Sequence, residues 1–189
     1  MARIEGVPER KAGLLVRLAY RYSRRRLGKV LEPLAIIARR PWLMLAVGAY
    51  ELGLERSRRL EPRLKELAYL KAGALVGCPW CLDIGSALSR ALGVTEEQVT
   101  DLHRYRESPA FSEQEKLVLE YAERMTRTPV EVPDDLFQAL RRHFDDAQLV
   151  ELTAAVAWEN YRARFNHALG IQPQGFAEGM VCALPEQPV

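Results

Sequence analysis

Apolar residues recur with helical spacing along almost the whole of this sequence, and no other feature limits its possible folds as strongly. Apolar positions at i, i+3, i+4 and i+7 predict an amphipathic helix with one buried face. We find no run of alternating β-branched residues between turn signals, which is the pattern of a half-buried strand. The sequence therefore predicts an all-α fold. The expected helices cover residues 9–26, 29–38, 41–57, 61–76, 79–92, 95–104, 112–127, 133–143 and 145–168.

Residue types with a known role at helix ends mark several of these boundaries. Thr95 with Gln98, and Ser112 with Glu115, have the spacing of a capping box, in which two side chains satisfy backbone N–H groups at a helix start. Gly93 follows a helical pattern at a position where a left-handed residue ends a helix. The loops between these ends are short, so we expect a compact bundle.

The length of the chain limits its domain organisation. With 189 residues, 48% of them hydrophobic, it is long enough for one well-buried domain and short for two. We expect a single all-helical domain over residues 1–189, with a basic helical extension at 1–40 and a tail at 171–189. No apolar run approaches the roughly 18 residues of a membrane span, and no signal-peptide pattern is present. These features predict a cytoplasmic protein.

Positive charge is concentrated in residues 1–40, which hold eleven Lys or Arg against three Asp or Glu. Their net charge is about +8 in a chain whose total is +2, so the remainder carries about −6. The segment forms a basic amphipathic helix, whose apolar stripe we expect to pack on the bundle or on a neighbouring subunit rather than on a membrane. No nucleic-acid-binding motif accompanies the charge, so we expect no nucleic-acid partner. The stripe consists of Leu14, Leu15, Leu18, Tyr22 and Leu27.

Two cysteines stand three residues apart, in the sequence Cys78-Pro79-Trp80-Cys81. The helical pattern breaks at Gly77 and resumes after Pro79, which predicts Cys78 as the N-cap residue of the second helix. Unpaired N–H groups at a helix start favour negative charge and so stabilise a thiolate, the nucleophilic form of cysteine. In a reducing compartment, where structural disulfides are rare, this pattern favours redox chemistry.

Two other interpretations of the cysteine pair remain open. Free cysteines are often small buried hydrophobic residues with no chemical role. A zinc site would need more ligands than one C-x-x-C supplies, and the three histidines, His103, His143 and His167, lack the spacing of zinc ligands. We therefore expect no metal and no cofactor.

Glu66 precedes Cys78 by twelve residues, which on one continuous helix would separate the two by about 18 Å. They can meet only if the chain turns, and the segment from Gly73 to Gly77 offers such a turn. A carboxylate brought back in this way can accept a thiol proton. Considered alone, Glu66 is more typical of a solvated helix residue or a salt-bridge partner.

The segment from Glu66 onward resembles the AhpD-like alkyl hydroperoxidases of the carboxymuconolactone decarboxylase superfamily. Their motif has a Glu, then the first cysteine of a C-x-x-C pair twelve residues later, then a His four residues after the second cysteine. Glu66, Cys78 and Cys81 match this motif, whereas Gly85 stands at the His position. The resemblance covers roughly residues 30–176 and implies an AhpD-like helical bundle that forms homo-trimers or hexamers.

The resemblance also implies roles for the matching residues. In the family, the His links the Glu to the second cysteine, which attacks a hydroperoxide, and the first cysteine then closes the disulfide. Here this implies that Cys81 is the nucleophile, Cys78 the resolving cysteine and Glu66 the base. Gly85 has no side chain that can carry a proton, and Asp83, His167 or a water molecule are the candidates to replace the His.

The expected function is that of a thiol-dependent peroxidase or disulfide reductase. An organic hydroperoxide or another small molecule is its substrate, and an external thiol reductant protein restores the cysteines. Two alternatives remain open: a non-catalytic oligomeric redox sensor or small-ligand-binding protein, and a lyase of the carboxymuconolactone decarboxylase type.

Overall fold

The computed structural model describes residues 2–186, and within them the chain forms nine α-helices, two short 3-10 helices and no strand. The all-α prediction is confirmed. The elements are η1 (Glu9–Lys11), α1 (Leu14–Leu27), α2 (Glu32–Ile37), α3 (Pro41–Arg56), α4 (Pro62–Val76), α5 (Pro79–Ala91), α6 (Glu96–Asp101), η2 (Leu102–Arg104), α7 (Glu113–Thr126), α8 (Asp134–Arg141) and α9 (Asp146–Ala168).

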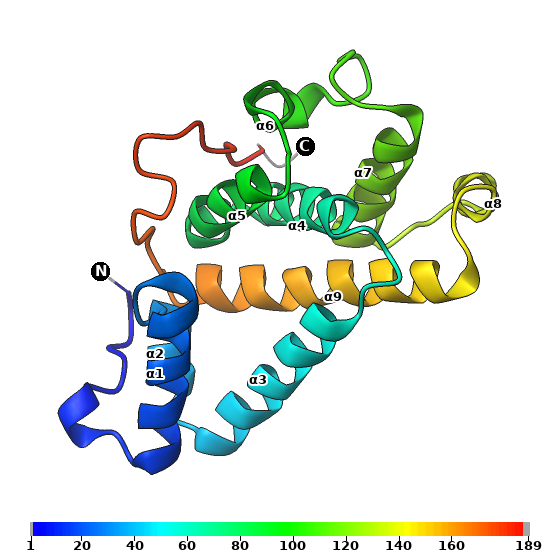
Figure 1. Ribbon diagram of the computed structural model, residues 1–189. Coiled ribbons are helices and arrows are strands. Elements are labelled where there is room, and N and C mark those ends of the chain that lie inside the picture. Colours follow the sequence, from blue (N-terminus) through cyan, green and yellow to red (C-terminus); the bar gives the residue numbers. More distant parts are fainter. Residues whose placement is uncertain (1, 187–189) are drawn as a thin grey trace.

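Helix α4 lies at the centre of the bundle, with α5 and α7 on one side and the long helix α9 on the other (Figure 1). It buries residues on all sides, so two apolar cores form around it. One core joins α4 to α7, α8 and α9, and includes Leu64, Val118 and Leu152. The other joins α4 to α5, α6 and α7, and includes Leu70 and Leu82. The central position of α4 fixes the geometry of every helix that contacts it.

Local capping chemistry determines several helix starts. The side chains of Thr95 and Ser112 each accept a hydrogen bond from a backbone N–H three residues later, in the expected capping boxes. Asp145 and Gln148 form a third capping box at the start of α9. The helix expected at 9–26 is interrupted, because Gly13 takes an extended conformation and caps α1.

The N-terminal helices pack at the end of α9 that carries Phe165. The predicted stripe of α1 does not pack on the bundle: Val16, Tyr20 and Ser23 face the chain, whereas most of the stripe faces outward, where a neighbouring subunit was the other expected contact. Leu14 is 75% exposed and Tyr22 47% exposed. No other part of the described chain covers most of this stripe. Among residues 2–186, no helix has the length and apolar character needed to cross a membrane.

The segment after α9 packs against the bundle and runs back along α5 (Figure 1). The buried Asp83 carboxylate accepts hydrogen bonds from the backbone N–H groups of Gln174 and Ala177, at 2.8 and 2.9 Å. The buried ammonium of Lys71 donates to both carboxylate oxygens of Glu186, at 2.6 and 2.8 Å. This C-terminal segment therefore closes the bundle over α5.

Candidate redox site

The two cysteines of the C-x-x-C sequence meet at the N-terminus of α5, where they are joined by a disulfide. Cys78 is the N-cap residue, and its sulfur accepts a hydrogen bond from the backbone N–H of Cys81 at 3.1 Å. Gly77 makes the preceding turn with a φ of 70°, a conformation that a side chain would strain. The expected position of Cys78 and Pro79 at the helix start is confirmed.

The cysteines lie where α4, α5 and α9 meet, and each helix contributes residues about one turn apart. Such residues share one face of a helix. The side chains and glycines that face this junction are Glu66, Tyr69 and Gly73 on α4, Cys81 and Gly85 on α5, and Glu159, Arg162 and Asn166 on α9. Cys78 is fully buried and Cys81 is 7% exposed, so Cys81 is the more accessible of the pair.

Glu66 is buried at this junction, one turn of α5 away from Cys81. Its Oε1 atom lies 3.6 Å from the position that a Cβ on Gly85 would occupy, and Gly85 follows Cys81 by a helical rise of about 6 Å. Burial raises the pKa of Glu66 to about 8, an effect that Arg162 opposes and that Glu159 reinforces. At pH 7 the group is therefore mainly the neutral acid.

A second carboxylate, Glu159, lies beside Cys81 itself. The position that a Cβ on Gly73 would occupy is 3.4 Å from Glu159 Oε1 and 3.5 Å from the Cβ of Cys81. Because residue 73 is a glycine, no side chain fills that position. Asn166, one turn after Arg162 on α9, donates a hydrogen bond from Nδ2 to the sulfur of Cys81 at 3.5 Å.

Arg162 holds the acidic groups of the site together. Its Nε donates to Glu159 Oε2 at 2.8 Å, its Nη2 contacts the same oxygen, and its Nη1 donates to Glu51 of α3 at 3.2 Å. The guanidinium also lies 4.7 Å from the ring centre of Tyr69. Although burial lowers the pKa of Arg162, the two carboxylates raise it above its ordinary value, so the cation persists.

The residues that the sequence offered as replacements for the missing His have other partners. The two oxygens of the Asp83 carboxylate accept hydrogen bonds from backbone N–H groups of the C-terminal segment. His167 lies at the surface, with Nδ1 3.0 Å from the backbone oxygen of Gly77.

The third cysteine, Cys182, is an exposed free thiol whose sulfur lies 3.6 Å from Ser86 Oγ. Among residues 2–186, no group of three or more His, Cys, Asp or Glu is arranged to hold a metal ion.

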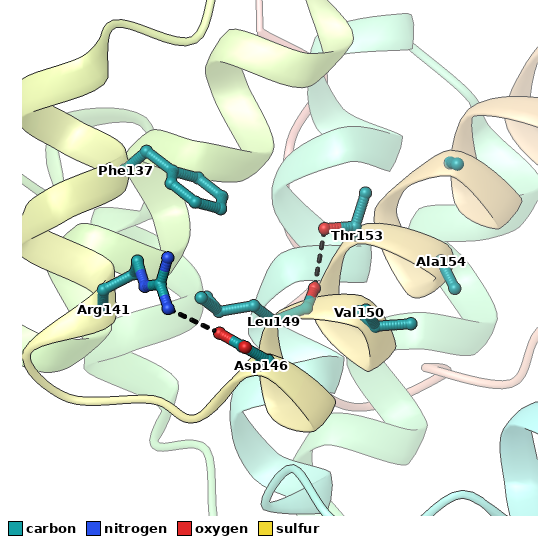
Figure 2. A pocket seen from close by; sticks show the side chains of 8 residues that line it. Phe137, Arg141, Asp146, Leu149, Val150, Thr153 and Ala154 are labelled. Atoms are coloured by element: carbon teal, nitrogen blue, oxygen red, sulfur yellow. Dashed lines mark hydrogen bonds and ion pairs between the residues drawn. The ribbon is translucent and has the colours of Figure 1, made fainter.

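A shallow groove of about 570 Å³ lies elsewhere, between α8 and the start of α9 (Figure 2). Phe137, Leu149 and Val150 line it, and Arg141 pairs with Asp146 at its edge, at 3.0 Å. The groove residues of α9 extend from Asp146 to Ala157. Ala157 precedes Glu159 by two residues, which at about 100° per residue places the two side chains on nearly opposite faces of the helix. The groove is therefore separate from the thiols.

The fold agrees with comparisons to known proteins. Residues 41–124 match the Carboxymuconolactone decarboxylase family. The chain is 35% identical over 181 residues to the uncharacterized protein YnjA of Escherichia coli K12, covering 95% of this chain and 97% of YnjA. This chain belongs to the carboxymuconolactone decarboxylase and AhpD-like superfamily.

Solved structures of this superfamily show the same fold. A protein of unknown function from Agrobacterium tumefaciens, described as a candidate AhpD antioxidant defence protein, is 32% identical, with a TM-score of 0.69 over 72% of this chain and 94% of its own. An uncharacterized peroxidase-related protein from Ralstonia eutropha JMP134 has a TM-score of 0.81 at 21% identity, over 93% and 94% of the two chains. The debrominase Bmp8 also reaches 0.81 at 18% identity, over 92% of each chain. The last two show the fold alone.

Gly73, Arg162 and Asn166 lie at the site but were not predicted as site residues from the sequence. Glu159, Arg162 and Asn166 are spaced by three and four residues on a long helix, so the sequence could predict that they share one face. That this face meets the cysteines depends on how α9 packs against α4 and α5, which helical spacing alone does not determine.

Proposed function

We propose that the protein is a thiol-dependent peroxidase that reduces organic hydroperoxides through Cys78 and Cys81. The observation that carries the proposal is a C-x-x-C disulfide at a helix N-terminus beside two buried carboxylates. Reversible thiol chemistry needs a stabilised thiolate and groups that move protons. A helix N-terminus favours the first, and buried carboxylates can serve as the second. The AhpD-like relatives support the same chemistry.

In this proposal Cys81 is the nucleophile and Cys78 the resolving cysteine. Cys81 is the more exposed sulfur and receives the hydrogen bond of Asn166, which favours negative charge on it. The Cys81 thiolate attacks the hydroperoxide and becomes a sulfenic acid, while the alcohol leaves. The Cys78 thiol then attacks that sulfur, water leaves, and the disulfide forms. An external dithiol protein reduces the disulfide, which fits a cytoplasmic location.

Glu66 belongs to the proposed site as a proton-exchanging group. With a pKa of about 8, it is a proton donor at pH 7 and a base only at higher pH. Its distance from Cys81 along α5 means that a further group or a water molecule must connect the two.

We also propose that the protein forms a homo-oligomer through the outer face of α3. This helix is rich in apolar residues, yet of its side chains only Met44 and Leu54 are buried within the chain. Trp42 is 84% exposed and Leu43 55% exposed, which is unusual for an apolar helix that has no partner. A second copy of the chain would cover this surface.

The test of the peroxidase proposal is consumption of tert-butyl hydroperoxide by the protein in the presence of dithiothreitol. We expect turnover in the wild type and in Cys182→Ser, which removes the thiol outside the pair. Cys81→Ser should abolish turnover, and Cys78→Ser should stop at a Cys81 sulfenic acid that dimedone traps. Equal rates in wild type and Cys81→Ser, or no turnover in the wild type, would refute the proposal.

A further inference from the structure

The proposed peroxidase chemistry requires a proton to leave the Cys81 thiol, yet the site lacks the side chain expected to move it. Gly85 stands where the motif has a His, and Glu66 lies beside Gly85 rather than beside Cys81. A separate group at the level of Cys81 must therefore perform this step. Gly73 is the part of α4 that adjoins Cys81, so a group that faces Gly73 lies on the same side as the thiol.

Glu159 is the ionisable group in that position. A single point, the empty Cβ position of Gly73, lies within ordinary contact distance of both Glu159 Oε1 (3.4 Å) and Cys81 Cβ (3.5 Å). These two distances place Glu159 Oε1 within about 7 Å of Cys81 Cβ, a gap that one water molecule can bridge to carry a proton between the carboxylate and the thiol. The absence of a side chain at Gly73 keeps this space open.

Arg162 orients the carboxylate for this purpose. Its two hydrogen bonds go to Oε2 of Glu159, whereas the oxygen that faces Gly73 and Cys81 is Oε1. The guanidinium is held in turn by Glu51 and Tyr69. One oxygen is thus fixed and the other is turned toward the thiol.

The electrostatic surroundings of Glu159 suit proton exchange with a thiol. The groups that face it are Arg162 on its own helix, Glu51 on α3, Glu66 and Tyr69 on α4, and the cysteines on α5. Burial raises the pKa of Glu159 above its ordinary value, while Arg162 counters part of that rise and Glu51 adds to it. A raised value is closer to that of a thiol, near 8.5, which makes transfer between the two groups easier.

We propose that Glu159 accepts the proton of the Cys81 thiol and returns it to the departing alkoxide, replacing the histidine relay that this chain lacks. This inference rests on the proposed peroxidase function. Arg162 acts as a positioning residue, and Gly73 keeps the space between carboxylate and thiol open.

The step is balanced without a further reactant. Cys81 gives its proton to Glu159, and the resulting thiolate attacks the terminal oxygen of the hydroperoxide. The S–O bond forms as the O–O bond breaks, and the alkoxide leaves with the electron pair of the broken bond. Glu159 then gives the same proton to the alkoxide, so the products are the Cys81 sulfenic acid and an alcohol.

Two rates measured on Glu159→Gln test the inference. In a Cys182→Ser background at pH 7, tert-butyl hydroperoxide reduction should fall about 100-fold, because proton transfer in the transition state is lost. Alkylation of Cys81 by iodoacetamide, measured with Cys78→Ser added, should not fall. Alkylation releases iodide, which needs no proton, whereas peroxide reduction releases an alkoxide that does. Thiolate can still form by exchange with water, and removing a neighbouring negative charge favours that form.

A matched control separates this effect from loss of a buried ion pair. Glu151 lies on the same helix, is buried to a similar degree and pairs with the buried Lys65. Glu151→Gln should therefore leave both rates of the folded protein unchanged. If Glu159→Gln does not fold, Gly73→Ala replaces it as the test variant. The inference then predicts that Gly73→Ala lowers the rate of peroxide reduction and leaves the rate of alkylation unchanged. Its methyl group fits at ordinary contact distances and fills the space between Glu159 and Cys81, while Gly53→Ala on α3, where a Cβ meets nothing within 4 Å, is its control.

The outcomes are distinct. A fall in peroxide reduction with alkylation retained supports the inference. Unchanged peroxide reduction, or a parallel fall in both rates, overturns it and leaves Glu159 a structural partner of Arg162, with the peroxidase proposal intact. A wild type without peroxide turnover refutes the proposed function itself, and this inference with it.

Discussion

At the scale of single residues, Gly85 is the position where this chain differs from the motif of the AhpD-like proteins that it resembles. A Cβ there would lie 3.6 Å from Glu66 Oε1 and 3.0 Å from Leu70 Cδ2, the movable end of a flexible side chain. An imidazole at this position would stand between Glu66 and Cys81, which are about one turn apart along α5. A Cβ at position 85 thus needs only a small shift of Leu70.

We therefore expect Gly85→His to raise the rate of hydroperoxide reduction by about 10-fold or more, within the range of general acid–base catalysis. The same change should make Glu159 less important, so that Glu159→Gln costs less in the Gly85→His background than in the wild type. Both are measured as kcat/KM for tert-butyl hydroperoxide. Gly85→Gln adds a polar side chain of comparable length that does not exchange protons at neutral pH, and a gain as large in that variant would contradict the relay explanation.

Glu66 makes a second prediction at the residue scale, through the linkage between its protonation and folding. Its pKa is about 8 in the folded chain, against an ordinary value of 4.5. Between these two values the folded state retains a proton that the unfolded state has released, so the free energy of unfolding falls as pH rises. The expected fall between pH 5 and pH 8 is a few kcal/mol, since each pKa unit corresponds to about 1.4 kcal/mol.

Urea unfolding at a series of pH values measures this effect. Glu66→Gln cannot ionise at this position, so its stability should decline less steeply than that of the wild type across the window, with Glu159, whose pKa burial also raises, left to contribute. Glu61→Gln, which changes an exposed carboxyl at the start of the same helix, should keep the decline. Parallel curves for wild type and Glu66→Gln would mean that Glu66 titrates normally.

At the scale of secondary-structure elements, the C-terminal segment depends on one buried side chain. Asp83 accepts hydrogen bonds from the N–H groups of Gln174 and Ala177. Asp83→Ala leaves two backbone donors without their acceptor, and bonds to a charged group contribute about 1.5–3 kcal/mol each. We expect a loss of roughly 3 kcal/mol in urea unfolding, with faster proteolysis of residues 172–186. Glu178→Ala, in an exposed part of the same segment, is the control, and an equal loss there would argue against a specific role for Asp83.

Helix boundaries were largely predictable from the sequence because they depend on local chemistry. The capping boxes at Thr95 and Ser112, and Cys78 at the start of α5, need only neighbouring residues to form. The interruption at Gly13 was missed because a single glycine does not break an apolar periodicity. The position of Glu159 beside Cys81 was also out of reach, since it arises from the packing of α9 against α4 and α5.

The orientation of α1 shows the same limit. Its periodicity predicts a helix, but two stripes on that helix carry apolar residues. The stripe with Tyr20 is buried, and Tyr20 donates a hydrogen bond to the backbone oxygen of Val7 at 2.6 Å. The stripe with Leu14 and Leu18 was expected to pack on the bundle or a neighbouring subunit, and it stays exposed in the isolated chain. Tertiary contacts determine which of the two stripes becomes buried, and the periodicity of the sequence does not contain that information.

At the scale of the whole molecule, apolar surface remains exposed on both α1 and α3. A folded chain gains stability when such surface leaves water, at about 25 cal/mol per Å², and α3 is covered only along the line of Met44 and Leu54. Oligomerisation through α3 would bury Trp42, Leu43 and Tyr50, which are 84%, 55% and 42% exposed. Large aromatic residues at the centre of an interface carry much of its binding energy.

Trp42→Asp therefore provides the decisive test of assembly. A charge placed in the apolar interface should shift the protein toward monomer, because the carboxylate would have to lose its water on association. Light scattering coupled to size-exclusion chromatography measures the mass at several concentrations, and the unfolding of the isolated chain should change little, since Trp42 makes few contacts within it. Val130→Asp introduces the same charge at a residue that is 63% exposed in the loop before α8, and it should leave the mass unchanged. A monomeric wild type, or a Trp42→Asp protein with the wild-type mass, would exclude α3 as the interface and leave its apolar face to a different partner.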